Sequence, residues 1–314
     1  MRPGIDVECR EVGLRDGLQI QKVFFPTQDK IRWLTLEAAA GMPEIEVCSF
    51  VPPKLLPQFA DNKEVVAAAL KIDGLCVAAL SPNMRGAQDA FQAGIHKLNY
   101  VTSVSESHNM SNVRRTVDES VADFERIVAL RDSTPGAKDI RLCTGLATAL
   151  GCTIEGNVAV SAVLKLAERF VEAGADELSV ADTVGYANPQ QVKAMFEAVI
   201  GEFGKTVPIS AHFHDTRGLG LANTFAALEA GCRRFDASLA GLGGCPFAPN
   251  ATGNIVMEDL VFLLEGAGLK TGVDIDKLVE IREIVARNLP DETLYGMYAR
   301  AGAPKGFVPA SAAA

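Results

Sequence analysis

The sequence predicts a (β/α)8 TIM barrel with a C-terminal helical extension, because strand-like and helix-like segments alternate along its length. Short apolar runs typical of buried strands lie at residues 7–12, 44–50, 75–80, 97–103, 140–144, 177–181, 209–214 and 235–240. Helical periodicity fills the intervals, at residues 28–40, 62–71, 85–93, 118–131, 159–173, 189–200 and 222–230, and an eighth helix follows at 255–265. A further helix at 275–286 forms the extension.

Glycines mark the ends of several of these predicted helices. Ala-Gly steps at 40–41, 93–94, 173–174 and 230–231 are typical of helix ends, since glycine accepts the left-handed backbone that satisfies the last carbonyls. A doubly wound open sheet is the competing architecture, but no GxGxxG turn follows the first predicted strand. We therefore expect one catalytic domain over residues 1–302, followed by a disordered small-residue tail at 303–314.

The composition excludes several classes of partner. The 314 residues include 39 Asp and Glu against 30 Lys and Arg, and this net charge of −9 disfavours nucleic acid and anionic membranes. No apolar run approaches the roughly 18 residues that a membrane span requires. Seven scattered cysteines without a CxxC pair, and no apolar signal segment at the N-terminus, predict a reduced, cytoplasmic protein.

Polar side chains gather where the predicted strands end. Active sites of such barrels lie at the C-terminal ends of the strands. The candidates there are Glu11, Arg15, Asp16 and Gln19 after strand 1, Glu46 and Ser49 in strand 2, Asp182 after strand 6, His212 and His214 in strand 7, and Cys245 and Asn254 after strand 8.

The spacing of His212 and His214 predicts a metal site. Residues two apart in a strand point to the same face, and neutral imidazole is a common metal ligand. Asp16 reaches this pair only if the barrel closes. Carboxylate and amide oxygens with imidazole, without thiolate, favour Mg²⁺ or Mn²⁺ over zinc. The alternative is a strand-end histidine pair that bonds to backbone or water.

Two further residues have a chemical and a structural interpretation. Arg15 is either one half of a strand-end ion pair with Asp16 or a permanent charge aimed at developing oxyanion charge. Cys245 lies in GLGGCPFAPNATGN, a glycine- and proline-rich stretch typical of a mobile active-site loop. Its thiol is either an acid or base or a passive small residue in a turn. His108 lies on the same rim as a weaker candidate for ligand contact.

Five segments together resemble the hydroxymethylglutaryl-CoA lyase family: EVGLRDGLQ, SFVPPKLLPQFAD, ADTVG, HFHDTRGLGLANT and GLGGCPFAPNATGN. The resemblance runs in order from about residue 7 to about residue 275. The Arg-Asp step and the HxH pair mark only the wider group of metal-dependent barrels. The cysteine loop is much more specific to acyl-CoA lyases.

The resemblance implies divalent-metal-dependent retro-Claisen cleavage of (S)-3-hydroxy-3-methylglutaryl-CoA to acetyl-CoA and acetoacetate, in a homodimer. It implies that Arg15 stabilises the thioester enolate, that Cys245 transfers a proton, and that His212 assists at the hydroxyl. The implied metal ligands are Asp16, His212, His214 and Asn254; the implied supporting residues are Glu11, Gln19, Glu46, Ser49, Ser179 and Asp182.

Departures from the family pattern leave the acyl group open. Leu14 replaces the usual proline before Arg-Asp, Ile20-Gln21 replaces Asn-Glu, and Leu55 replaces a common tryptophan. The alternatives are a lyase for a related 3-hydroxy-3-alkylglutaryl-CoA, or a 2-oxo-acid aldolase or Claisen synthase of the same superfamily. A barrel that only binds acyl-CoA or a metal is the non-enzymatic alternative.

Overall fold

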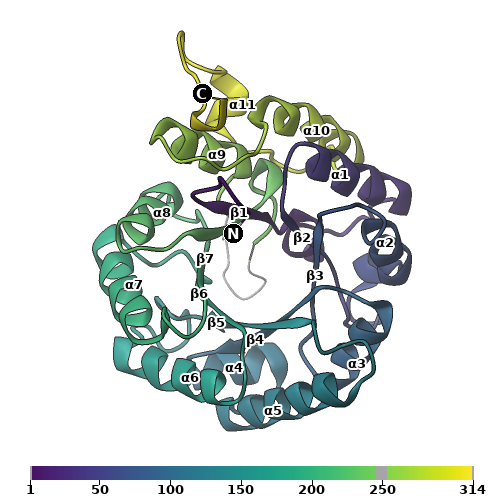
Figure 1. The fold of residues 1–314 in the computed structure, drawn as a ribbon, viewed down its shortest axis with the longest axis vertical. Helices are drawn as coiled ribbons and strands as arrows, with labels where there is room; N and C mark the ends of the chain where they lie inside the picture. The colour runs from purple at the N-terminus through teal and green to yellow at the C-terminus, as the bar shows by residue number, and fades with distance from the viewer. Residues whose placement is uncertain (1, 245–252, 313–314) are drawn as a thin grey trace.

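The computed structural model describes residues 2–244 and 253–312 and contains a closed barrel of eight parallel strands (Figure 1). The predicted barrel is thereby confirmed. The strands are β1 (Glu8–Glu11), β2 (Glu44–Ser49), β3 (Cys76–Leu80), β4 (Lys97–Ser103), β5 (Arg141–Ala147), β6 (Glu177–Asp182), β7 (Ile209–Phe213) and β8 (Arg234–Ala237). β8 closes the barrel by pairing with β1, with Glu11 opposite Ala237.

Helices surround the barrel, and the C-terminal ones extend it on the side of β1 (Figure 1). The outer ring contains α1 (Thr27–Ala39), α2 (Asn62–Ala69), α3 (Met84–Ala93), α5 (Val117–Ser133), α6 (Val160–Glu172), α7 (Pro189–Phe203) and α8 (Gly220–Glu229). The C-terminal helices are α9 (Met257–Gly266), α10 (Ile275–Asn288) and α11 (Met297–Ala301). α9 packs on β1, and α10 packs on α1, so the extension covers the seam where the barrel closes.

Several short elements were not predicted, because they lack an apolar period. They are the π-helical turn η1 (Gly13–Gly17), helix α4 (Glu106–Val113) and the 3-10 turns η2 (Pro57–Phe59), η3 (Leu239–Gly241) and η4 (Ala310–Ala312). α4 is a polar helix whose start is capped by the Ser105 hydroxyl, which accepts a hydrogen bond from the His108 N–H at 3.2 Å. η1 directly follows β1 and carries Arg15 and Asp16. The unpredicted turns therefore include the one that carries two candidate site residues.

The barrel interior holds charged side chains as well as apolar ones. Arg10 on β1 bonds Glu177 on β6, and these strands are not neighbours in the sheet, so the contact crosses the interior. Lys97 Nζ lies 2.8 Å from Glu44 and 3.0 Å from Glu177. All four side chains are almost fully buried. Because a buried charge without a partner is costly, these ions hold opposite sides of the barrel together.

The glycines at the predicted helix ends adopt the left-handed backbone, with φ of +98° at Gly41, +79° at Gly94, +99° at Gly174 and +102° at Gly231. Gly41 has a second constraint, since a Cβ there would lie 2.2 Å from the Gly272 carbonyl oxygen. At Gly94 the nearest atom to such a Cβ would be 3.8 Å away. Gly41 therefore allows the segment before α10 to approach α1 closely.

The C-terminal segment for which the sequence predicted disorder makes defined contacts over its described part, residues 303–312. The Phe307 and Phe262 rings lie 5.0 Å apart. Ser311 donates its N–H and its hydroxyl to the Glu265 carboxylate on α9, at 2.7 and 2.6 Å. Small residues surround these two anchors, and small residues were the basis for expecting disorder.

Within the described residues, no helix has the length and apolar character needed to cross a membrane.

A pair of alanine substitutions tests the close approach at Gly41. Gly94→Ala lowers the free energy of unfolding by about 1 kcal/mol through left-handed strain alone. Gly41→Ala adds a backbone clash and lowers it by about 1–3 kcal/mol more. Urea unfolding followed by circular dichroism measures both, and equal losses would contradict the close approach.

Candidate active site

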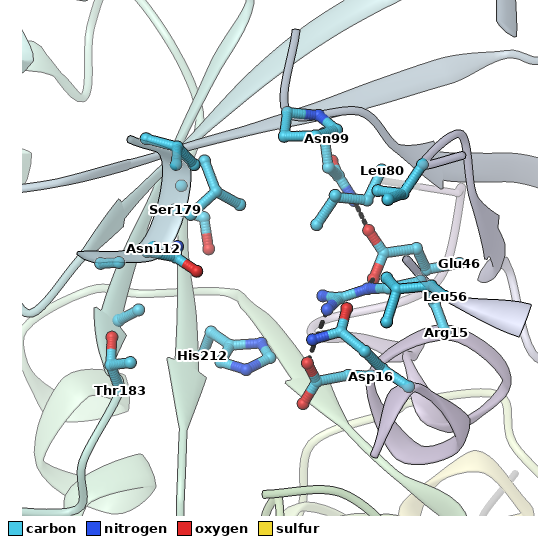
Figure 2. Close-up of a pocket in the computed structure, with 18 of the residues that line it drawn as sticks. Arg15, Asp16, Glu46, Leu56, Leu80, Asn99, Asn112, Ser179, Thr183 and His212 are labelled. Carbon is cyan, nitrogen blue, oxygen red and sulfur yellow. Dashed lines mark hydrogen bonds and ion pairs between the residues drawn. The ribbon is translucent and has the colours of Figure 1, made fainter. Parts of the chain in front are cut away.

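A cavity of about 620 Å³ opens at the C-terminal ends of the strands. Its lining combines polar residues from β1, β2, β4, β6, β7 and β8 with apolar residues near its opening. Figure 2 shows Arg15, Asp16 and Glu46 on one side of this cavity and Ser179, Thr183 and His212 on the other. The cavity lies where the fold class predicts the active site of such a barrel.

Asp16, His212 and His214 come together at the bottom of this cavity. One ligand atom of each lies within 4.8 Å of the others, close enough to share an ion. Asp16 and His214 are buried, and His212 is only slightly exposed. Closure of β1 on β8 brings residue 16 to residues 212 and 214, as the metal-site prediction required.

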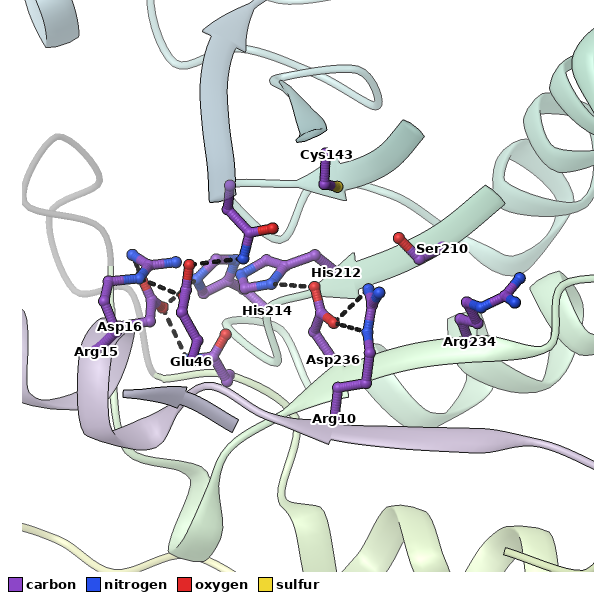
Figure 3. Close-up of polar contacts among 12 residues, drawn as sticks. Arg10, Arg15, Asp16, Glu46, Cys143, Ser210, His212, His214, Arg234 and Asp236 are labelled. Atoms are coloured by element: carbon purple, nitrogen blue, oxygen red, sulfur yellow. Dashed lines mark hydrogen bonds and ion pairs between the residues drawn. The ribbon is translucent and has the colours of Figure 1, made fainter. Parts of the chain in front are cut away.

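Hydrogen bonds orient both imidazoles through their Nδ1 atoms. His212 Nδ1 lies 3.2 Å from Asp236 Oδ2, and His214 Nδ1 lies 3.1 Å from the Asp182 carbonyl oxygen. Each ring therefore keeps Nε2 for a metal, an arrangement common in metalloproteins. Burial opposes charge on His212, but Asp236 outweighs it and raises the pKa of that imidazole. Figure 3 shows Asp236 between His212 and Arg10, whose Nε lies 2.7 Å from Asp236 Oδ1.

Asn254 lies beside this cluster and bonds to Asp16. Its Nδ2 donates to Asp16 Oδ2 at 2.8 Å and to the Leu242 carbonyl at 2.9 Å. Its Oδ1 is buried and has no hydrogen-bond partner among the described residues. An unpartnered buried oxygen is costly, and a cation beside it would remove that cost. A Cβ at Gly243 would lie 2.5 Å from this amide nitrogen, so glycine is required there.

Arg15 is held in the cavity by two carboxylates. Its Nε donates to Glu46 Oε2 at 2.5 Å and its Nη1 donates to Asp16 Oδ1 at 2.6 Å. Glu46 in turn accepts a hydrogen bond from Asn99 Nδ2 at 2.8 Å (Figure 2). Burial alone would raise the pKa of Asp16, but the charge of Arg15 and the nearby imidazoles lower it well below its usual value. These charges therefore favour the carboxylate form of Asp16.

Glu11 ties the turn that carries Arg15 and Asp16 to the end of β8. Its carboxylate accepts the Gly13 N–H at 2.5 Å and the Leu239 N–H at 3.0 Å. Burial raises the pKa of Glu11 to about 8, partly opposed by those two N–H groups. Glu11 therefore stabilises the turn that carries Arg15 and Asp16, and it is not itself among the residues that line the cavity.

The other predicted site residues divide into two groups. Gln19 and Ser179 line the cavity. Ser49 and Asp182 are buried beside it: the Ser49 hydroxyl donates to the Leu80 carbonyl at 3.3 Å, and the Asp182 carboxylate accepts the Tyr186 and Ala187 N–H groups at 2.9 and 3.1 Å. Cys245 lies outside the described residues, so its role stays a prediction.

Some cavity residues were missed by sequence reasoning. Arg10, Asn99 and Asp236 lie in the middle of strands rather than at their ends, and all three line the cavity. The sequence signal available for these three residues was a charged or polar residue within an otherwise apolar strand.

His108, the weaker candidate from the sequence, also lines the cavity, with its Nδ1 2.7 Å from the Ser103 hydroxyl. Burial lowers the pKa of His108, which therefore favours the neutral form.

Comparisons with known proteins place this site in a family. A family model described as HMGL-like matches residues 6–285. Hydroxymethylglutaryl-CoA lyase YngG of Bacillus subtilis is 40% identical over 294 residues, which are 92% of this chain and 96% of the relative. The mitochondrial hydroxymethylglutaryl-CoA lyase of Mus musculus is 39% identical over 287 residues, 91% of this chain and 87% of the relative. The chain belongs to the hydroxymethylglutaryl-CoA lyase family.

Solved structures agree with this membership. An HMG-CoA lyase from Acenitobacter baumannii, in complex with coenzyme A and 3-methylmalate, matches with a TM-score of 0.88 and 38% identity over 98% of this chain and 99% of that one. The carboxyl transferase domain of Rhizobium etli pyruvate carboxylase matches at 19% identity and a TM-score of 0.69, over 95% of this chain and 50% of that one, which shows a shared fold. Family membership makes the chain a carbon–carbon lyase.

The carboxylate behind His212 provides a test of the metal site. Asp236→Asn weakens Mn²⁺ binding about 10–100-fold, because the amide holds the Nδ1–H of His212 less strongly. Titration calorimetry measures this affinity. Glu8→Gln is the matched control, since that carboxylate has similar burial but pairs with Arg234 outside the cavity lining. Equal affinities in the two variants would contradict a role for Asp236.

Proposed function

We propose that this chain cleaves (S)-3-hydroxy-3-methylglutaryl-CoA to acetyl-CoA and acetoacetate. The observation that carries the proposal is the position of Arg15, which bonds Asp16 beside His212 and His214 in one cavity. The relatives named above are lyases for this thioester, and one was solved with coenzyme A. The fixed guanidinium of Arg15 beside the candidate metal site suits a reaction that develops negative charge on the substrate.

The residues fit a divalent cation, and we propose Asp16, His212, His214 and Asn254 as its ligands. One carboxylate, one amide oxygen and two imidazoles, with room for substrate oxygens, suit Mg²⁺ or Mn²⁺. Such an ion, when bound, makes a substrate hydroxyl easier to deprotonate. The protein supplies the geometry, because Asp236 and the Asp182 carbonyl hold the two rings in place.

Arg15 compensates the charge that cleavage creates. A base removes the proton of the tertiary hydroxyl, the adjacent C–C bond breaks, and its electron pair moves onto the thioester as an enolate. The former alcohol carbon becomes the ketone of acetoacetate. Arg15 is permanently charged and is oriented by Glu46 and Asp16, so it needs no reorganisation as the enolate forms.

Two proton transfers complete the reaction. In this proposal His212 lies near the reacting hydroxyl and helps to position it. With Nδ1 toward Asp236 and Nε2 kept for the metal, it has no nitrogen free to take the hydroxyl proton, which passes to water. Cys245 supplies the proton that converts the enolate to acetyl-CoA. A neutral thiol suits that role, so its pKa does not need to be lowered. Gln19, Ser49, Ser179 and Asp182 support substrate binding and site geometry in the same proposal.

A second candidate is a lyase for a related 3-hydroxy-3-alkylglutaryl-CoA. The observation that favours it is Leu55, which lines the cavity opening and stands where the family commonly has tryptophan. A smaller side chain there leaves more room at the opening. We also propose a cytoplasmic homodimer; a cytoplasmic relative of Rattus norvegicus is 37% identical over 90% of this chain.

A substrate panel with defined metal ions tests the proposed reaction. After treatment with a chelator the enzyme releases no acetyl-CoA from 3-hydroxy-3-methylglutaryl-CoA, and Mg²⁺ or Mn²⁺ restores release. Coupled detection across thioesters with 3-methyl, 3-ethyl and longer branches identifies the acyl group. Indifference to chelator would contradict the metal site, and cleavage of a 2-oxo-acid aldol without coenzyme A would favour an aldolase.

Replacement of Arg15 tests its role at the enolate. Arg15→Gln lowers kcat about 10²–10³-fold, equivalent to ~3–4 kcal/mol of lost transition-state stabilisation, and leaves KM nearly unchanged. Steady-state kinetics measure both constants, and Mn²⁺ calorimetry checks that the metal ligands remain in place. A variant with near-normal kcat and intact metal binding would remove Arg15 from the mechanism.

A further inference from the structure

Among the described residues, two segments contribute exposed side chains to the opening of the cavity. The exposed lining residues all lie in these segments: Pro52 and Leu55 in one, and Ser111, Asn112 and Arg114 in the other. Figure 2 shows Leu56 and Asn112 on opposite sides of the cavity. The first segment, residues 51–56, is apolar except for the exposed Lys54, and the second runs through the polar C-terminal end of α4. Among the described residues, these two segments are therefore the ones that a substrate contacts where the cavity meets solvent.

Arg114 differs from the other arginines that line the cavity, because their charges are already neutralised. Arg10 pairs with Asp236 and Glu177, and Arg15 pairs with Glu46 and Asp16. Arg115 pairs with Asp123 at 2.8 Å and donates to the Pro82 carbonyl at 3.0 Å. Within residues 2–244 and 253–312, the Arg114 guanidinium has neither an ion pair nor a hydrogen bond.

The backbone of Arg114 is also unusual. It ends α4 in the left-handed conformation, with φ +56° and ψ +40°, and its N–H donates to the Met110 carbonyl at 3.0 Å. Glycine or asparagine normally occupies this position of a helix end. An arginine there costs roughly 1 kcal/mol, and strained residues of this kind cluster at ligand-binding sites. At the opening of the cavity, Arg114 therefore combines a strained backbone with a guanidinium that has no partner among the described residues.

The chemistry of an acyl-CoA matches this division of the cavity. The reacting acyl group is small and reaches the buried polar residues at the bottom. The pantetheine arm is long and uncharged, and it can pass along the apolar lining residues Val51, Pro52, Leu55 and Leu56. The nucleotide end carries a diphosphate and a 3′-phosphate, which emerge where the cavity meets solvent. On a chain of net charge −9, a local cation is needed to receive these phosphates.

We propose that Arg114 binds a phosphate group at the nucleotide end of the acyl-CoA substrate. This inference rests on the proposed function and adds to it a residue that recognises the carrier rather than the acyl group. A guanidinium forms two parallel hydrogen bonds to phosphate oxygens, which suits it to this task. Arg114 acts in binding and takes no part in the chemistry at Arg15 and the metal ligands.

Truncated substrates separate a phosphate contact from any other role. Arg114→Asn removes the charge and keeps a residue that tolerates the left-handed backbone, so its melting temperature equals or exceeds that of the unmodified protein. Its KM for 3-hydroxy-3-methylglutaryl-CoA rises about tenfold, with kcat unchanged. For the corresponding pantetheine thioester, which has no nucleotide, KM is the same in both proteins. The 3′-dephospho-CoA thioester shows which phosphate is bound.

Arg85→Gln is the control for the change in net charge. Arg85 is an exposed arginine at the start of α3 that pairs with Asp89 and does not line the cavity. The Arg85→Gln substitution leaves KM unchanged for both thioesters. An equal rise in KM for both thioesters in Arg114→Asn, or no rise for either, would overturn the proposal.

Binding of coenzyme A alone separates this inference from the proposed reaction. In titration calorimetry Arg114→Asn weakens coenzyme A about tenfold and leaves any binding of pantetheine unchanged. If the unmodified protein cleaves no thioester yet shows this difference, the proposed reaction fails and the phosphate site stands. If it cleaves thioesters and coenzyme A binds both proteins equally, the phosphate site fails alone.

Discussion

Closure of the barrel at β1 and β8 is the constraint on which the rest of the structure depends. Asp16 follows β1, and the two histidines belong to the end of β7, almost two hundred residues later. Pairing of β1 with β8 places them within 4.8 Å of one another. Asn254 then bonds Asp16 and presents an unpartnered oxygen. Without this closure the chain would have neither a cavity nor a ligand set.

A network of buried charges inside the barrel connects β1 and β6 to His212, one of the candidate metal ligands. Arg10 bonds Asp236, which orients His212, and Arg10 also bonds Glu177 across the barrel. Removing one partner from such a buried network leaves an uncompensated charge, at a cost of about 3–5 kcal/mol. An apolar interior of similar volume would be no less stable, so the network is better explained by the orientation it imposes. The orientation of His212 thus originates in the interior of the barrel, whereas the backbone carbonyl of Asp182 orients His214.

The two arginines Arg15 and Arg114 line the same cavity in different surroundings. Arg15 at the bottom is held by two carboxylates, which leave it little freedom and orient it toward one place. Arg114 at the opening is exposed and has no such partners among the described residues. The different roles that we propose for these two arginines follow from their surroundings, since the residue type is the same. Burial and pairing, rather than charge alone, distinguish them.

The order of elements and most of the candidate site could be predicted from local sequence. Apolar periodicity located the strands, Ala-Gly steps located helix ends, and Arg15, Asp16 and the HxH pair lay at predicted strand ends. The same reasoning missed Asp236 and α4. A charged residue within a strand has no local pattern that reveals its partner, and a polar helix has no apolar period.

The sequence by itself determined the fold class, the family likeness and the residue types at the metal site, because these depend on short-range patterns. The tertiary structure alone decided which of those residues meet. It placed Ser49 and Asp182 beside the cavity rather than in it, and it left Arg114 at the opening without a partner in the part of the chain that is described. Such outcomes depend on contacts between segments far apart in the chain, and no local pattern encodes the distance between them.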